Sequence, residues 1–355
     1  MRNFTFKGLF LTAVFILLGC LSIQAADDDL ITKQITIKLD EAGTLPKKIG
    51  SSRMYKITNL KIVGEIDGTD WHMIRMMAGR DYQGDVTKGN LSVLDLSEAK
   101  IVEGGRDYYG YYYDGWSYRY DTYYDEIGDY AFKGCSGLTS LTLPATITTI
   151  GKYAFEECTG LTSLTLPAGI TSIGRNAFSG CSGLTSLTLP AGITSISDYA
   201  FYGCSGLTSL TLPAGITSIG EYAFCGCSGL TSLTLPAGIT EIGSSAFSYC
   251  SGLTSIYVYS EKVPKIGSDV FYYVDKKKCT VYVPKGTYAD YRSSNFGYFE
   301  NIVEFDPTGI DKTTTSTDVE EVSRYSVNGQ RLVGPTKGLN IVKYSDGSVK
   351  KVVVQ

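Results

Sequence analysis

CSGLTSLTLPAGITSISDYAFYG, residues 181–203, is one unit of a repeat that runs with a period of 23 from Ile127 to about Pro264. Cysteine and phenylalanine recur at fixed places in the units: Cys135, Cys158, Cys181, Cys204, Cys227 and Cys250, and Phe132, Phe155, Phe178, Phe201, Phe224 and Phe247. Internal periods of roughly 20 to 50 residues are typical of solenoids and other repeat architectures. The repeat therefore decides the fold.

The apolar positions explain how one unit folds. Leu184–Leu189 has the pattern L-x-x-L-x-L, which predicts a short strand with one buried face, and Pro190 ends that strand. A turn then carries Ile193 and Ile196 inward, and Ala200–Phe201 closes the back of the coil. Because one coil cannot bury its own apolar residues, neighbouring coils must stack into a continuous core with a parallel β-sheet on one side.

Degenerate coils extend the regular array at both ends. Residues 91–96 keep the strand pattern, Ile266 and Phe271 keep the five-residue offset of the units, and 281–284 supply a last strand. The sequence thus predicts a leucine-rich-repeat solenoid of about eight coils over residues 91–305, with regular units at 127–264. Strands about 4.8 Å apart make six regular coils a stack of roughly 30 Å.

The segments that flank the solenoid have other compositions. Residues 26–90 predict a small α+β N-terminal cap with strands at 34–39 and 55–63 and a short amphipathic helix that contains Trp71, Met73, Met76 and Met77. Residues 306–322 have the composition of a linker. Residues 323–355 predict a small all-β tail domain with strands at 325–332, 339–343 and 349–354, separated by Asn-Gly and Asp-Gly turn signals.

Residues 1–25 have the features of an export signal. Arg2 and Lys7 precede an apolar run of about 16 residues, and the small-residue site Ile23-Gln24-Ala25 follows it. Leu17-Leu18-Gly19-Cys20 offers a second interpretation, in which Cys20 is acylated and the mature chain is tethered by lipid. The sequence places the chain outside the cell by either route, and contact with a membrane is expected only through that lipid.

The repeat resembles the BspA-like class of bacterial leucine-rich repeats. The class has the unit I-x-x-I-x-x-x-A-F-x-x-C-x-x-L-x-x-L-x-L-P, which stands here as ITTIGKYAFEECTGLTSLTLP, and the resemblance covers residues from about 90 to 305. It implies a surface or secreted protein, and some members are implicated in adhesion to host matrix proteins and to other bacteria. The tail, residues 325–355, resembles C-terminal sorting domains of the type IX secretion class.

The residue inventory predicts no catalytic or metal centre and no cofactor. His72 is the only histidine, and no nucleophile elbow, P-loop or dinucleotide fingerprint occurs. The six periodic cysteines either form a reduced, buried structural ladder or, since neighbouring coils lie within disulfide range, bridge in pairs. Parallel Cβ directions favour the reduced ladder, and Cys225 is the thiol expected to be exposed. A formal net charge of −4 without a basic patch argues against nucleic acid as a partner.

Residues 106–124, RDYYGYYYDGWSYRYDTYY, interrupt the array, and nine of these 19 residues are tyrosine. We expect an insertion loop that either binds a ligand or caps the first coil. Tyrosine and tryptophan supply large contact areas and are enriched in binding hot spots. The candidate contact residues are Tyr109, Tyr111, Tyr112, Tyr113, Trp116, Tyr118 and Tyr120.

Two further surfaces repeat along the coils. Tyr130, Tyr153, Tyr199 and Tyr222 form a broken stripe that packs neighbouring coils or contacts a ligand. The outward Ser and Thr of each strand make a polar face that is solvated or serves for docking. Three functions stay open for a monomeric chain: a protein-binding or adhesion scaffold, which we favour, a glycan-binding protein that uses the insertion, and a structural spacer of the cell envelope.

Overall fold

The computed structural model describes residues 30–307, 321–326, 331–332, 337–344 and 349–354. The predicted export signal at 1–25, the lipidation candidate Cys20 and most of the predicted linker lie outside these residues. No helix in the described part of the chain is long and apolar enough to cross a membrane.

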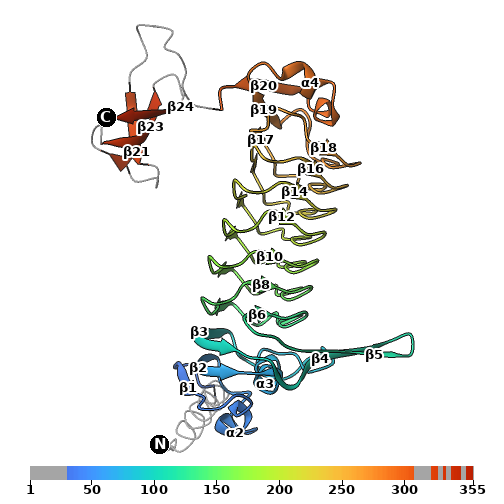
Figure 1. Ribbon diagram of the computed structural model, residues 1–355, viewed down its shortest axis with the longest axis vertical. Coiled ribbons are helices and arrows are strands. Elements are labelled where there is room, and N and C mark those ends of the chain that lie inside the picture. The colour runs from blue at the N-terminus through green and yellow to red at the C-terminus, as the bar shows by residue number, and fades with distance from the viewer. Residues whose placement is uncertain (1–29, 308–320, 327–330, 333–336, 345–348, 355) are drawn as a thin grey trace, which may run out of the picture.

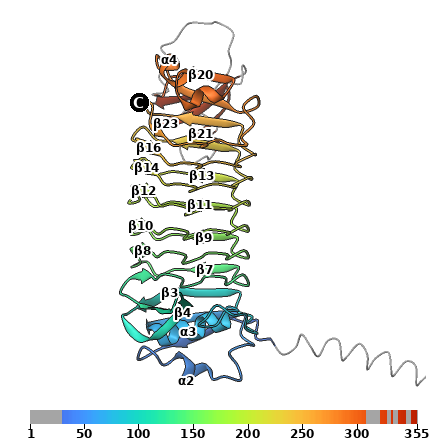
Figure 2. The same ribbon diagram turned by 90° about the vertical axis from the view of Figure 1, so that its right-hand side faces the viewer.

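The regular units stack in parallel, as the 23-residue period predicts. Identical residues pair across neighbouring coils, for example Leu141 with Leu164 and Leu187 with Leu210. Figures 1 and 2 show the resulting column of coils. Its strands are β7 (Ser140–Thr142), β9 (Ser163–Thr165), β11 (Ser186–Thr188), β13 (Ser209–Thr211), β15 (Ser232–Leu235), β17 (Ser255–Val258), β19 (Thr280–Pro284) and β20 (Asn301–Phe305). The leucine-rich-repeat solenoid is confirmed, although residues 281–284 are not its last strand, since β20 pairs beyond them.

A second row of very short strands runs along the coils, where the sequence predicted only a turn. In all but one of these coils the backbone N–H of a glycine donates to the carbonyl of an isoleucine in the preceding coil, as Gly174 does to Ile150 at 2.8 Å. Figure 2 shows this second row beside the main sheet. Its strands are β6 (Glu126–Ile127), β8 (Thr149–Ile150), β10 (Ser172–Ile173), β12 (Ser195–Ile196), β14 (Ser218–Ile219), β16 (Glu241–Ile242) and β18 (Lys265–Ile266).

The N-terminal segment continues the main sheet. Its strands β1 (Ile35–Lys38) and β2 (Asn59–Ile66) lie parallel to each other, and β2 pairs with β3 (Val93–Ile101), which pairs with β7. The predicted count of about eight coils is therefore too low, because the strands form sheets of seven and four members. Two helices cover this end, α2 (Leu45–Ile49) and the predicted helix, α3 (Gly68–Met77).

Phenylalanine rings and cysteine thiols fill the core of the coils. The rings of successive coils stack, for example Phe178 on Phe201 at 5.3 Å with 2° between their planes. From Cys158 to Cys250 each periodic cysteine thiol donates to the carbonyl of the phenylalanine one coil earlier, as Cys181 Sγ does to Phe155 O at 3.0 Å. All six periodic cysteines are fully buried and free. Cys225 is also buried, so the prediction that it is exposed was wrong.

One coil departs from the pattern, because Ser197 stands where its neighbours have glycine. A Cβ on Gly174 would lie 2.7 Å from the carbonyl carbon of Gly151, so the usual coil spacing leaves no room for a side chain here. The Ser197 hydroxyl donates to Ile173 O at 2.6 Å, and the second row divides between β10 and β12. On the main sheet β11 keeps one residue pair with β9, and a hollow of about 480 Å³ lies there. We call this level the Ser197 junction.

The C-terminal tail is an antiparallel sheet, in agreement with the all-β expectation. It contains β21 (Glu321–Ser326), β22 (Arg331–Leu332), β23 (Gly338–Tyr344) and β24 (Val349–Val354), in the order β22-β21-β23-β24. The predicted first strand at 325–332 is replaced by β21 and β22, and the residues between them lie outside the described ranges. Arg324 donates to Asn340 Oδ1 at 3.2 Å inside the sheet.

Candidate functional site

The tyrosine-rich insertion is a β-hairpin, which corrects the expectation of a loop. Its strands β4 (Gly104–Tyr113) and β5 (Trp116–Thr122) pair antiparallel, with Tyr113 opposite Trp116. Asp114 and Gly115 between them both have positive φ, 48° and 79°, which is the conformation of a tight hairpin turn with a primed twist. Figure 1 shows the hairpin extending away from the column of coils.

The base of the hairpin is fixed to the helix and to the first regular coil. Tyr108 is buried, and its hydroxyl donates to Asp129 O at 2.7 Å. The Thr122 hydroxyl donates to Val102 O at 2.8 Å, which holds the returning strand. The Trp71 ring on α3 lies 6.3 Å from the Tyr108 ring. The hairpin therefore leaves the solenoid in a defined direction.

One face of the hairpin carries rings that stack on each other. The Tyr111 and Tyr118 rings are cross-strand partners 5.0 Å apart, with 14° between their planes. Tyr109 then stacks on Tyr130 of the first regular coil at 4.8 Å, and Tyr130 stacks on Tyr153 of the next coil at 4.8 Å. We call this set the tyrosine row: Tyr109, Tyr111, Tyr118, Tyr120, Tyr130 and Tyr153.

Cationic side chains pack over the inner part of the tyrosine row. The Arg75 guanidinium lies 4.9 Å from the Tyr109 ring centroid, and Lys133 Nζ lies 5.3 Å from that of Tyr130. Burial raises the pKa of the Tyr120 hydroxyl from its usual 10.0 to about 12, in keeping with its packing in the row. Cation–π contacts of this kind contribute about 0.5–2 kcal/mol each. The inner row is thus a packed structural element.

The predicted contact residues divide into two groups along the hairpin. Tyr109 is only 6% exposed, so its assignment as a contact residue was wrong: it belongs to the core. Tyr111 and Tyr120 are half-buried in the tyrosine row. Tyr112, Tyr113 and Trp116 form what we call the hairpin tip, with exposed fractions of 77%, 69% and 71%, while Tyr118 of the tyrosine row is 41% exposed. Tyr123 and Tyr124, which were not in the predicted set, are exposed near the base.

The tyrosine stripe along the coils is built on left-handed backbone. Tyr130, Tyr153, Tyr199 and Tyr222 have φ between 54° and 61°, and the rings of Tyr199 and Tyr222 stack at 4.8 Å. Asn176 takes the same conformation in the coil that breaks the stripe. Side chains at this position pack coil against coil, which supports the packing interpretation of the stripe.

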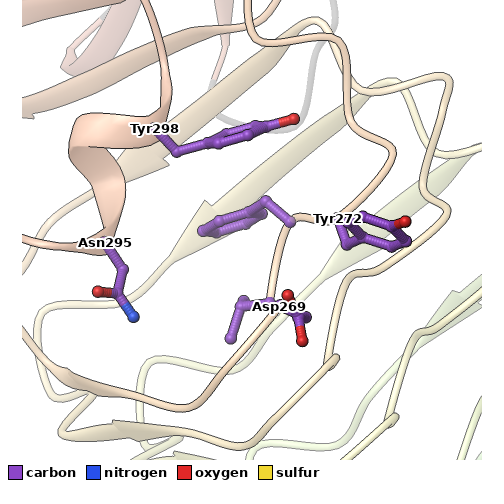
Figure 3. Close-up of a pocket in the computed structure, with 6 residues that line it drawn as sticks. Asp269, Tyr272, Asn295 and Tyr298 are labelled. Atoms are coloured by element: carbon purple, nitrogen blue, oxygen red, sulfur yellow. The ribbon is translucent and has the colours of Figure 1, made fainter.

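A second hollow, which the sequence did not indicate, lies at the other end of the solenoid. It has a volume of about 330 Å³ and is lined by residues of the turn after β18 and of the 3₁₀-helix η1 (Asn295–Tyr298). Figure 3 shows four of these residues, Asp269, Tyr272, Asn295 and Tyr298, around the hollow. Its residues come from two separate segments, so no local motif marks it in the sequence.

The histidine and carboxylate positions show how the N-terminal end is built. His72 lies on α3, and burial lowers the pKa of its ring. The Asp70 carboxylate accepts hydrogen bonds from the N–H groups of Gly43 and Leu45 at 2.6 and 2.8 Å, which ties α2 to α3. Within the described ranges no three His, Cys, Asp or Glu side chains gather as metal ligands would.

Comparison with known proteins places the repeats in a family. A family model described as the BspA type leucine rich repeat region matches residues 125–224 and 171–303, in six copies. A search of curated proteins found no match.

Solved structures give more distant likenesses. A leucine-rich-repeat protein of T. pallidum is 32% identical over 37% of this chain and 62% of its own, with a TM-score of 0.35. A leucine-rich cell surface protein of Faecalibacterium prausnitzii is 33% identical over 44% of this chain and 47% of its own, with a TM-score of 0.33. One from Bacteroides ovatus is 22% identical over 76% of this chain and 69% of its own, with a TM-score of 0.40. The chain spans less than two thirds of the first two proteins.

Proposed function

Because this chain belongs to the BspA-type leucine-rich-repeat family, we propose that it is an exported binding protein whose hairpin tip contacts a protein partner. The observation that carries this proposal is the exposure of Tyr112, Tyr113 and Trp116, each at least 69% exposed, at the end of a hairpin with a fixed base. Clustered large aromatic side chains at a surface are typical of binding hot spots.

The stacking behind the tip supports this role. Ordering a free loop on binding costs conformational entropy, which weakens affinity. Here the tyrosine row joins the hairpin to the first coils through Tyr109 and Tyr130. The tip is therefore presented in one orientation before a partner arrives, as rigid aromatic anchors are in affinity-matured paratopes.

The same stacking favours a protein over a glycan at this site. Tyr111 and Tyr118 turn their faces to each other, so those faces are not free to stack on sugar rings. Arg119 is paired with Asp107 at 3.4 Å, which leaves fewer polar groups to bind hydroxyls. A projecting aromatic tip fits a concave apolar pocket in a partner, such as a host matrix protein.

Export and anchoring belong to the proposal as well. The signal-like residues 1–25 support delivery outside the cell, by cleavage or by lipidation of Cys20. The tail that includes β21 and β24 supports recognition by a type IX secretion system, through its resemblance to sorting domains. The chain then acts as a monomeric, non-enzymatic scaffold at the cell surface or in the medium.

The test is binding of residues 26–355 to immobilised fibronectin, fibrinogen, collagen and mucin by surface plasmon resonance. The variant carries Tyr112→Ser, Tyr113→Ser and Trp116→Ser, which leave the stacked rings in place. Tyr202→Ser is the matched control, since Tyr202 is 43% exposed on a coil far along the chain from the hairpin. We expect saturable binding that falls at least tenfold in the triple variant and persists in the control.

Other results would support the other two functions. If the chain binds only mucin and the triple variant loses that binding, the hairpin tip would be a glycan-binding site. Equal binding by the variant and the parent would exclude the hairpin tip. The absence of saturable binding to all four surfaces would favour a structural spacer.

A further inference from the structure

The hollow near the C-terminal end of the solenoid is a second, separate candidate site. Figure 3 shows the Tyr298 ring along one side and the side chains of Asn295 and Asp269 on the other. Its volume of about 330 Å³ is at the lower end of the range for small-molecule pockets, which suits a ligand the size of one ring.

The aromatic walls of this hollow are held in place by the protein. The Tyr298 hydroxyl donates to Val274 O at 3.1 Å, and the ring packs edge to face on Phe299 at 5.3 Å. Phe271 lies beneath with 5% exposure and packs on Phe299 at 5.2 Å. Tyr298 nevertheless remains 45% exposed, so part of its ring is open to a ligand. The site is preformed and needs little reorganisation to bind.

Two polar side chains complete the hollow with hydrogen-bond acceptors. Asn295 Nδ2 donates to Gly267 O at 3.2 Å, which orients the amide and leaves its Oδ1 as an acceptor. The Asp269 carboxylate, at a turn residue with φ of 55°, also lines the hollow. In the part of the chain that the structure describes, neither acceptor has a hydrogen-bonding partner. Both can accept from ligand hydroxyl groups.

The charged side chains at the hollow disfavour charged ligands. The Asp269 carboxylate disfavours an anion. Lys276 Nζ lies 6.0 Å from the Tyr298 ring centroid, so a cation over this ring would meet a like charge. A neutral ligand with an apolar face and several hydroxyl groups satisfies both limits.

We propose that this hollow binds a single neutral pyranose ring of a glycan, independently of the hairpin tip. The weakly positive C–H bonds on one face of the sugar pack on the Tyr298 ring, whose face is electron-rich. Hydroxyl groups on the sugar donate to Asn295 Oδ1 and Asp269. The solenoid then carries an aromatic contact for protein at one end and a sugar site at the other.

The test uses saturation-transfer NMR on residues 26–355 with the methyl glycosides of glucose, galactose, mannose and N-acetylglucosamine at about 10 mM each. A single sugar ring binds with millimolar Kd, about −4 kcal/mol, so this concentration detects it. We expect saturation of one glycoside, lost in Tyr298→Ala and weakened at least fivefold in Asn295→Ala. Tyr298→Phe, which keeps the ring, is expected to bind within about threefold of the parent.

Controls separate loss of the site from loss of the fold. Tyr288→Ala removes a tyrosine of similar exposure, 46%, that does not line the hollow, and binding is expected to persist. Circular dichroism melting of each variant checks that it is folded, and Asn295→Ala gives the answer if Tyr298→Ala does not fold. No transfer to any glycoside, transfer unchanged in the folded variants, or transfer to choline chloride alone would overturn the proposal.

Discussion

The rings of Tyr109 and Tyr130 lie parallel, 4.8 Å apart with 13° between their planes, although one belongs to the hairpin and the other to the first regular coil. Their contact joins a projecting two-stranded hairpin to the solenoid. Isolated hairpins of this kind are marginally stable in water. The stacked pair therefore helps to hold the hairpin, and with it the hairpin tip, in one orientation relative to the solenoid.

Replacing Tyr130 tests this relationship. Tyr130→Asn keeps a residue that tolerates the left-handed conformation, as Asn176 does two coils further along, but it removes the ring. We expect amide exchange of residues 104–122 to become about twofold to tenfold faster, since a stacked aromatic pair contributes roughly 0.5–1.5 kcal/mol. Tyr199→Asn is the control and should leave exchange in the hairpin unchanged. Unchanged exchange in Tyr130→Asn would show that the base alone holds the hairpin.

Neighbouring coils approach so closely at some glycines that adding one methyl group there should clearly lower the stability of the solenoid. A Cβ on Gly183 would lie 2.3 Å from Thr159 O in the preceding coil, whereas a Cβ on Gly137 meets nothing within 4 Å. We expect Gly183→Ala to destabilise the solenoid by about 1–3 kcal/mol, as overpacking does, and Gly137→Ala to change stability by less than about 0.5 kcal/mol. Chemical denaturation of both variants measures the difference. Equal midpoints would contradict the close packing of the coils.

The Ser197 junction predicts a substitution that stabilises. Ser197→Gly removes the Cβ that keeps β10 and β12 apart and lets the backbone N–H donate to Ile173, as Gly174 donates to Ile150. This bond replaces the one that the Ser197 hydroxyl makes to the same carbonyl, so we expect the gain to come from closer packing of the coils and to be at most about 1 kcal/mol. The reverse change, Gly174→Ser, should cost a similar amount or more. Thermal melting compares the two, and a lower Tm for Ser197→Gly would show that the junction has another cause.

The buried thiols predict how stability depends on pH. Burial raises the pKa of Cys158, Cys181, Cys204 and Cys227 well above the ordinary value of 9.0. In the unfolded chain these thiols ionise near 9.0, whereas in the folded chain they stay protonated. Their stabilising contribution is thus fully present below pH 9.0 and is lost as pH rises from there toward the folded pKa.

Denaturation midpoints at pH 7 to 10.5 measure this loss. Each thiol lowers the free energy of unfolding by at most about 1.4 kcal/mol per pH unit above about pH 9. Cys204→Ala should therefore make the total slope less steep by the contribution of one thiol. Iodoacetamide at pH 8 should leave these cysteines unlabelled in the folded chain and label them after unfolding. Rapid labelling of the folded chain would contradict a closed core.

The period of 23 was enough to predict the coils, the buried leucines and the parallel sheet. It did not reveal the second row of strands, because a two-residue strand such as β12 is too short to show a periodicity. Nor did it reveal that Cys225 is buried. Its position in the coil buries small side chains such as Ser179 and Ser248, while the larger Tyr202 extends beyond the surface.

The sequence indicated where the tyrosine-rich insertion lies, but not that it is a hairpin or which of its tyrosines are exposed. The Asp114-Gly115 pair is a hairpin-turn signal that could have revealed β4 and β5. Tyr109 and Tyr113 lie on the same face of the hairpin, so alternation along the strand could not separate the buried Tyr109, at the base, from the exposed Tyr113, at the tip. The hollow at Asn295 could not be found from sequence, because residues 269–272 and 295–298 meet only in the fold.

The Ser197 junction also has a mechanical meaning. Stiffness along a solenoid comes from the hydrogen bonds that link each turn to the next, and here the second row has no strand pairing across one level while the main sheet keeps a single residue pair. With the C-terminal end of the solenoid held, a sideways load on the hairpin tip would therefore bend the column most readily at this level and, after it, at the break of the main sheet between β13 and β15, where β14 and β16 remain paired. The column then behaves as stiff segments on compliant joints, so one end can swing relative to the other while each segment keeps its shape.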